Sequence, residues 1–168
     1  MPDEHPHSEL LELAKTVAVE AGEAVLKVYD KGDFDAYQKE DDSPVTSADY
    51  LANDIIVKRL SDATPDIPIL SEENKHASLE ERKDWPRYWL IDPIDGTQEF
   101  IARSGDFAVN IALIENNQPK IGVIFWPPGQ SLYFAEKGKG AFKSSPDGEE
   151  KIAVRKLDDP KNSVVMIA

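Results

Sequence analysis

The 168-residue sequence contains no cysteine, which excludes disulfide bonds and thiolate catalysis. Its three histidines are too scattered to form a zinc site. No apolar run approaches the roughly 20 residues that a membrane-spanning helix needs. The polar, acidic stretch 1–7 lacks the basic region and apolar core of a signal peptide. We therefore expect a cytoplasmic protein without a transmembrane segment.

Positive charge is also scarce. Nineteen Lys and Arg residues face 32 Asp and Glu residues, so the net charge is −13. Because nucleic-acid backbones require basic patches, this balance argues against nucleic acid as a partner. An anionic small molecule would have to be recruited locally, by bound cations or helix N-termini, against the overall field. The length and the 40% hydrophobic content suit one domain with a substantial core.

Apolar periodicity predicts two amphipathic helices near the start of the chain. The first is capped by Ser8 and ends before Gly32, and the second follows Thr46 and runs to about Leu60. The expected apolar face of the first contains Leu10, Leu13, Ala14, Val17, Ala21, Val25 and Tyr29, and that of the second contains Leu51, Ile55 and Leu60.

Short apolar or alternating runs predict strands at 67–70, 88–91, 107–114, 122–126, 132–135 and 152–154. The fold class expected from these elements is α+β. Two helices would pack on one face of a largely antiparallel sheet, with the acidic loops gathered at one end.

The run W-L-I-D-P-I-D-G-T-Q-E-F, residues 89–100, is the most informative motif. Pro93 has no N–H to donate, so we expect the preceding strand to end there, with Asp92 and Asp95 projecting into a turn. Mg²⁺ prefers oxygen ligands at roughly 2.0–2.1 Å, and two such aspartates can share cations. The alternative is a plain Asp-Gly turn in which Thr97 caps the next helix, but that alternative requires no second carboxylate.

A second acidic pair, Glu72 and Glu73, follows the apolar run 67–70. Taken alone, these residues could equally belong to a solvated loop. If the two strands end at the same edge of the sheet, Glu72 comes close to Asp92 and Asp95. Like charges in a shared site cannot all stay ionised unless a cation neutralises them, which favours a metal site.

Thr46 and Asp49 have the spacing of an acidic capping box at a helix start. Asp49 could therefore serve only the helix, or it could orient a hydroxyl such as that of Thr97; the sequence leaves both readings open. The charged segment 39–43 is expected to be a mobile, solvated loop, with an active-site lid as the alternative. The N–H groups of Gly96 and Thr97, at the start of a further helix, are candidate donors to a substrate phosphate.

Three motifs together resemble the inositol monophosphatase superfamily of metal-dependent, lithium-sensitive phosphatases. They are K-x-D-x-S-P-V-T-x-A-D at 39–49, L-S-E-E at 70–73 and W-L-I-D-P-I-D-G-T-x-E-F-I at 89–101. Ser71 and the pair Glu99-Phe100 make the chain most similar to the bacterial CysQ branch, the 3'(2'),5'-bisphosphate nucleotidases.

This resemblance implies specific roles for several residues. Two or more Mg²⁺ ions would be held by Glu72, Asp92, the carbonyl of Ile94 and Asp95. Thr97, paired with Asp49, would orient the attacking water, and Glu72 would share in catalysis. The implied substrate is adenosine 3',5'-bisphosphate, cleaved to AMP and phosphate.

The resemblance also bears on domain organisation. Members of the superfamily are longer and carry a further ligand aspartate in a W-D-x-A-A-like motif, which does not follow residue 97 here. The chain stops in the apolar run 164–168. We expect 1–168 to be the N-terminal metal-binding domain of a longer enzyme and nearly inactive alone. Inositol monophosphate or another sugar phosphate is the alternative substrate, and a non-catalytic metal- or partner-binding fragment is the alternative of another class. No oligomeric state is predicted.

Overall fold

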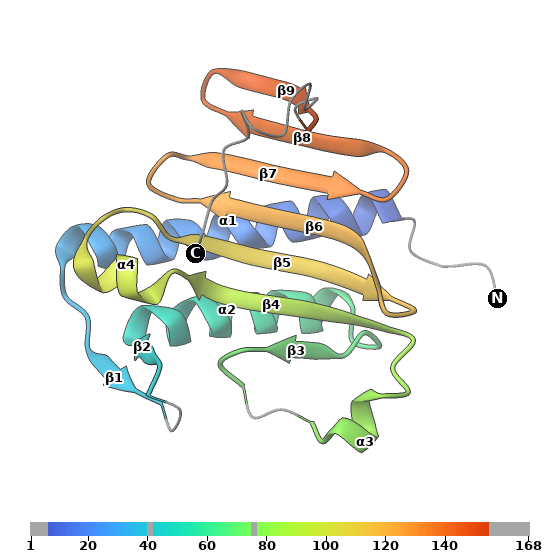
Figure 1. Cartoon of the computed structure of the whole chain (residues 1–168), viewed down its shortest axis with the longest axis horizontal. Helices are drawn as coiled ribbons and strands as arrows, with labels where there is room; N and C mark the ends of the chain where they lie inside the picture. Colours follow the sequence, from blue (N-terminus) through green and yellow to red (C-terminus); the bar gives the residue numbers. More distant parts are fainter. Residues whose placement is uncertain (1–6, 40–41, 75–76, 155–168) are drawn as a thin grey trace, which may run out of the picture.

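Two long helices lie side by side against one face of a seven-stranded sheet (Figure 1). They are α1 (His7–Lys31) and α2 (Ser47–Ala63). The computed structural model describes residues 7–39, 42–74 and 77–154. In this part of the chain, no helix combines the length and the apolar character needed to cross a membrane. The arrangement confirms the expected fold class, with two helices on a largely antiparallel sheet.

The sheet has the order β3-β4-β5-β6-β7-β8-β9. Only the pair β3 and β4 is parallel, and every other neighbouring pair is antiparallel. The strands are β3 (Ile69–Ser71), β4 (Arg87–Asp95), β5 (Ala108–Glu115), β6 (Gln118–Trp126), β7 (Ser131–Glu136), β8 (Gly140–Ser145) and β9 (Gly148–Ile152). The smaller elements are the hairpin strands β1 (Ala36–Gln38) and β2 (Pro44–Thr46), and the short helices α3 (Leu79–Arg82) and α4 (Thr97–Ala102).

Helix α1 has the apolar face that its periodicity predicts. Five of the seven expected residues are buried, and Leu13 and Tyr29 pack against the core they form. The helix ends where Gly32 adopts a positive φ of 67° and its N–H donates to the carbonyl of Val28 at 3.0 Å. Glycine adopts this left-handed conformation without a Cβ penalty, which explains the stop.

Helix α2 begins at the predicted capping box, but its buried face differs from the expected one. Leu51 is 38% exposed, whereas Ala52, Ile56 and Leu60 are buried. The inward face also carries two polar side chains, those of Asp49 and Asn53. Because these two buried positions are polar, the apolar periodicity of the sequence does not identify the buried face of α2 correctly. Both residues belong to the site described below.

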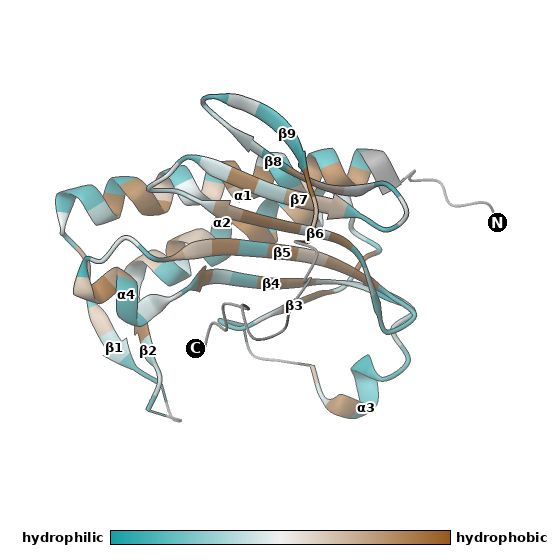
Figure 2. Ribbon diagram, turned by 45° about the horizontal axis from the view of Figure 1, so that its top comes forward, coloured by the Kyte–Doolittle hydropathy of each residue, from teal (hydrophilic) through white to brown (hydrophobic). Residues whose placement is uncertain are grey.

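The hydrophobic core lies between the two helices and the sheet. Alternate strand residues point into it, so that Trp89, Ile91, Ile111 and Leu113 are all buried. Brown apolar segments run along the central strands in Figure 2. The opposite face of the sheet is apolar too, because Leu90, Ile124 and Trp126 remain 41%, 48% and 39% exposed.

Several small elements were not predicted. The hairpin β1–β2, helix α3 and strand β8 have few apolar residues, so periodicity does not reveal them. The last strand was expected at 152–154 but lies at 148–152, where most of its residues are exposed. Such a charged, exposed strand is typical of a sheet edge. The apolar run 164–168 lies outside the described residues.

Candidate metal and phosphate site

Strand β4 continues past Pro93 to Asp95, so the expectation that the proline ends it was wrong. The pairing with β5 shows why a proline is tolerated. Asp92 pairs with Asn110 and Asp95 with Ala108, which means that three steps along β4 match two along β5. This β-bulge leaves a residue without a regular ladder position, where a missing N–H costs little.

The bulge also decides the direction of the two aspartates. In a regular strand, residues three apart point to opposite faces. One extra residue reverses this parity, so Asp92 and Asp95 both lie on the face turned away from the helices. The side chain of Asn110, on that same face, donates a hydrogen bond to Asp95 Oδ2 at 2.9 Å.

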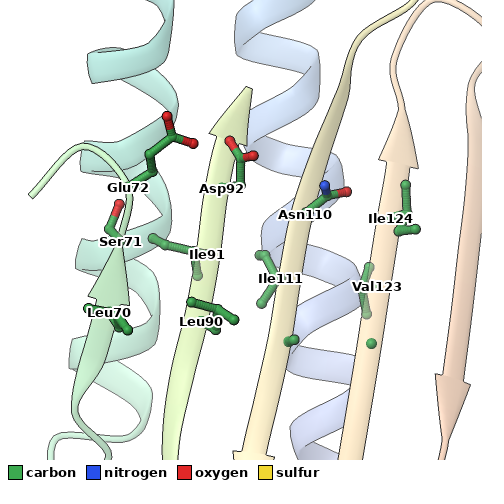
Figure 3. Close-up of a pocket in the computed structure, with 12 residues that line it drawn as sticks. Leu70, Ser71, Glu72, Leu90, Ile91, Asp92, Asn110, Ile111, Val123 and Ile124 are labelled. Carbon is green, nitrogen blue, oxygen red and sulfur yellow. The ribbon is translucent and has the colours of Figure 1, made fainter. Parts of the chain in front are cut away.

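Glu72 reaches the same edge through the parallel pairing of β3 with β4. Ser71 lies opposite Ile91, and the N–H of Glu72 still donates to the carbonyl of Ile91 at 3.3 Å. Figure 3 shows the Glu72 and Asp92 carboxylates side by side at the ends of their strands. The structure therefore brings Glu72, Asp92 and Asp95 to one edge of the sheet.

This edge has a strongly negative local potential. Burial, and then the charges of Glu72 and Asp95, raise the pKa of Asp92 from 3.8 to about 7. Burial also raises the pKa of Glu73, although Lys39 opposes that shift. A bound cation would relieve the repulsion and favour the ionised form of Asp92.

Lys39 is the cation that this structure places there. Its Nζ lies 2.9 Å from Glu72 Oε1 and 2.7 Å from Glu73 Oε1. Burial lowers the pKa of the ammonium, but the hydrogen bonds to Glu73 and Glu72 more than offset this, so the net pKa is raised. The expectation of a mobile, solvated loop was therefore wrong for Lys39, which ties the hairpin β1–β2 to the acidic edge. Two of the other residues in that segment, 40 and 41, lie outside the described part.

Asp49 serves both of the roles that the sequence left open. Its Oδ2 accepts hydrogen bonds from the N–H of Thr46 at 2.7 Å and from Thr46 Oγ1 at 2.6 Å, which completes the capping box. Its Oδ1 accepts from Thr97 Oγ1 at 3.2 Å. Burial raises the pKa of Asp49, and the hydrogen bonds from Thr46 and Thr97 oppose that rise.

Thr97 stands at the junction of β4 and α4. Its hydroxyl also lies 3.1 Å from the carbonyl of Ile94, so one proton is shared between that oxygen and Asp49. Gly96 precedes it with φ 95°, and a Cβ there would lie 2.7 Å from the carbonyl oxygen of Asp106. Only glycine fits this turn, and the turn delivers Thr97 beside Asp49.

Two amides that the sequence did not single out, Asn53 and Asn74, form a hydrogen-bonded chain with Ser71, whose hydroxyl accepts from the N–H of Glu73 at 3.2 Å. Ser71 Oγ donates to Asn53 Oδ1 at 2.6 Å, and Asn53 Nδ2 donates to Asn74 Oδ1 at 2.8 Å. Asn53 follows Asp49 by one helical turn, so a polar residue at that spacing on a buried face was the available signal. Asn110 was also missed, because its place in an alternating strand looked ordinary.

The donor set suits a hard cation, because carboxylate and carbonyl oxygens are the ligands that Mg²⁺ prefers. Among the described residues, however, no three His, Cys, Asp or Glu side chains form a group that could hold a metal ion as they stand. Glu72 is turned to Lys39 and Asp95 to Asn110. The donor atoms therefore fit the metal chemically, and Glu72 would have to rotate away from Lys39 to join such a group.

Comparison with known proteins identifies the family of this chain. The model of the inositol monophosphatase family matches residues 7–167. A 3'(2'),5'-bisphosphate nucleotidase CysQ from Salmonella typhimurium is 47% identical over 152 residues, which are 90% of this chain and 61% of the relative. The CysQ protein of Escherichia coli K12 is 43% identical over the same shares. The chain thus spans about three fifths of the length of the curated relatives it matches.

Solved structures give the same result. The crystal structure of CysQ from Bacteroides thetaiotaomicron, described as a bacterial member of the inositol monophosphatase family, superposes with a TM-score of 0.75 at 36% identity, covering 90% of this chain and 60% of that one. An IMPase from Thermotoga maritima gives 0.77 at 28% identity, covering 89% and 55%. With a family model that matches nearly its whole length, the chain belongs to the inositol monophosphatase family.

Proposed function

We propose that the protein is a Mg²⁺-dependent phosphomonoesterase that hydrolyses adenosine 3',5'-bisphosphate to AMP and phosphate. The observation that carries the reaction type is the Thr97–Asp49 hydrogen bond of 3.2 Å beside an edge that holds three carboxylates. The choice of substrate is supported by relatives named as 3'(2'),5'-bisphosphate nucleotidases at 43–47% identity.

In this mechanism Glu72, Asp92, the carbonyl of Ile94 and Asp95 would hold two or more Mg²⁺ ions. Such ions neutralise charge on the phosphoryl oxygens and make a bound water more acidic. Burial, and then the charges of Glu72 and Asp95, raise the pKa of Asp92, which supports this assignment because a bound cation would lower that pKa again.

The hydroxyl of Thr97 would position the attacking water. When its single proton is donated to Asp49, its lone pairs are left to accept a hydrogen bond from water, which fixes the orientation of that water. In that state the carbonyl of Ile94, which the Thr97 hydroxyl contacts at 3.1 Å, would be available to a cation. The N–H groups of Gly96 and Thr97 are proposed as donors to the phosphate. No covalent nucleophile is needed.

We further propose that the chain acts as the N-terminal metal-binding domain of a longer cytoplasmic enzyme. Two observations support this: the chain corresponds to 61% of the length of its curated relatives, and the face of the sheet beside the acidic edge carries exposed Leu90, Ile124 and Trp126. On this proposal, a substantial part of the substrate cleft comes from elsewhere, and 1–168 alone turns substrate over very slowly.

Phosphate release from a substrate panel tests the proposal. Adenosine 3',5'-bisphosphate, inositol 1-phosphate and a sugar phosphate would be assayed with Mg²⁺, using 1–168 and the protein read through past residue 168. We expect the longer protein to prefer the nucleotide and to be inhibited by lithium. If the longer protein preferred inositol 1-phosphate, the proposed nucleotide substrate would be wrong and the inositol phosphate would take its place. Absence of turnover by the longer protein, with metal binding intact, would favour a non-catalytic metal-binding module.

A further inference from the structure

Asn110 occupies a distinctive position in the sheet. It lies on β5 opposite Asp92, between Val109 and Ile111, which both point into the core. Its own side chain therefore points to the open face, where it lines a groove of about 580 Å³ together with Glu72 and Asp92 (Figure 3). It is an amide at the boundary between the acidic edge and an apolar surface.

The two ends of this amide have unequal surroundings. Nδ2 donates to Asp95 Oδ2 at 2.9 Å. Oδ1 is buried and has no hydrogen-bond partner among the residues that the structure describes. A buried acceptor without a partner destabilises the folded state. Rotating the amide by 180° would not help, because it would place Oδ1 against the Asp95 carboxylate.

Asp95 depends on this contact for its orientation. It is exposed, it follows the bulge of β4, and its hydrogen bond with Asn110 is the one side-chain hydrogen bond that its carboxylate makes in the described part of the chain. With Oδ2 held by the amide, Oδ1 is the oxygen that remains for a cation. The unfavourable burial of Asn110 Oδ1 therefore coincides with a favourable placement of Asp95.

We propose that Asn110 is a positioning residue that fixes the Asp95 carboxylate for cation binding. The inference rests on the proposed function, since it assigns Asp95 to the cation site. It predicts that Asn110 does not stabilise the metal-free fold, although it raises affinity for the cation. A purely structural residue would affect both in the same direction.

Asn110→Leu separates the two effects, because leucine is similar in size and has neither the donor nor the unpaired oxygen. Mn²⁺ affinity would be measured by calorimetric titration, and stability by thermal melting in EDTA. We expect an unchanged or higher melting temperature and about tenfold weaker Mn²⁺ binding, as is usual when the partner of a metal ligand is removed. Asn110→Ser, which keeps a small polar side chain, should weaken binding similarly if leucine disturbs folding.

Two controls make the experiment decisive. Ala112→Val alters the same groove on the same strand without touching Asp95, so Mn²⁺ affinity should not change. In an Asp95→Asn background, Asn110→Leu should produce no further loss, because its effect passes through the carboxylate. Wild-type Mn²⁺ affinity in Asn110→Leu, or an equal loss in both backgrounds, overturns the positioning role. Failure of the wild-type chain to bind Mn²⁺ would instead contradict the metal site itself.

Discussion

Thr97 Oγ1 lies 3.2 Å from Asp49 Oδ1 across 48 residues of sequence, and this contact joins the first turn of α4 to the first turn of α2. The other oxygen of Asp49 is committed to the capping box of α2. The capping hydrogen bonds therefore fix the Asp49 carboxylate, and this fixed carboxylate in turn orients the hydroxyl of Thr97.

This contact predicts a difference between two substitutions of Thr97. Thr97→Ser keeps the hydroxyl and should retain most of the phosphatase activity of the longer protein. Thr97→Val keeps the shape but cannot accept a hydrogen bond from water, so kcat should fall by about 10²-fold or more, the usual contribution of a positioned proton-handling group. Melting temperatures of the two variants should stay close. Equal activity of the two variants would exclude a role for the hydroxyl.

The raised pKa of Asp92 predicts how stability depends on pH. The folded protein retains this proton up to about pH 7, whereas a free aspartate loses it near 3.8. Between these values the folded state binds more protons, so the stability contributed by the protonated group is complete at the acid end and is lost as the pH rises through 7. Melting temperature in EDTA should therefore fall between pH 5 and pH 8.

Asp92→Asn checks the origin of that slope, because an amide does not titrate. The melting temperature of the variant should change less over the same pH range. Added Mg²⁺ should also raise that temperature less than it does in the wild type. For the wild type, stabilisation by Mg²⁺ should grow above pH 7, where the carboxylate is ionised without metal. A variant with the wild-type slope would mean that other carboxyls control the response.

The contacts of Lys39 predict that its ammonium group competes with a bound divalent ion for the acidic edge. Lys39→Met removes the ammonium that contacts Glu72 and Glu73, so a divalent ion no longer has to displace it. Mn²⁺ affinity should rise about fivefold, equivalent to about 1 kcal/mol, while the metal-free protein melts at a lower temperature. Lys58→Met is the matched control, because that lysine pairs with Asp62 on the exposed side of α2. Weaker Mn²⁺ binding by Lys39→Met would contradict the competition.

Gly96 allows a test of the turn that delivers Thr97. Gly96→Ala combines a positive φ of 95° with a Cβ only 2.7 Å from the Asp106 carbonyl, so the backbone must move. Gly138→Ala has a similar φ of 87° and open space, so it carries the conformational cost alone, about 1 kcal/mol. We expect a clearly larger loss for Gly96→Ala in urea denaturation, by about 1–2 kcal/mol. Similar losses at the two positions would show that the Asp106 contact relaxes freely.

The parts of this fold that depend on interactions between residues close in sequence can be predicted from the sequence. The periodicity of α1, the stop at Gly32 and the capping box at Thr46 all act within a few residues. The apolar runs before Glu72 and the two aspartates are short and unambiguous. Because residues that follow neighbouring parallel strands lie at the same edge of a sheet, the sequence predicts that these carboxylates lie together. The buried face of α2 was misjudged because Asp49 and Asn53, both polar, lie on it.

The remaining features depend on contacts between distant parts of the chain. Lys39 meets Glu72 across 33 residues, and no local pattern distinguishes it from a solvated lysine. The position of Asn110 next to the two aspartates depends on the register between β4 and β5, which the sequence does not show. The sequence alone predicts a strand end at Pro93, because a bulge can be recognised only when the partner strand is known.

That bulge makes the acidic edge sensitive to insertions and deletions rather than to side-chain chemistry alone. Adding one residue to β5 between Ala108 and Asn110 would let β4, with its three-residue spacing kept, pair regularly with β5 and would leave the core at Trp89 and Ile91 in place. The second carboxylate would then turn toward the helices and leave Asn110 behind. A homologue that keeps every acidic residue but has this additional residue in β5 would retain the architecture and lose the paired carboxylates, so the relative length of the two paired segments is as diagnostic of function as their residue types.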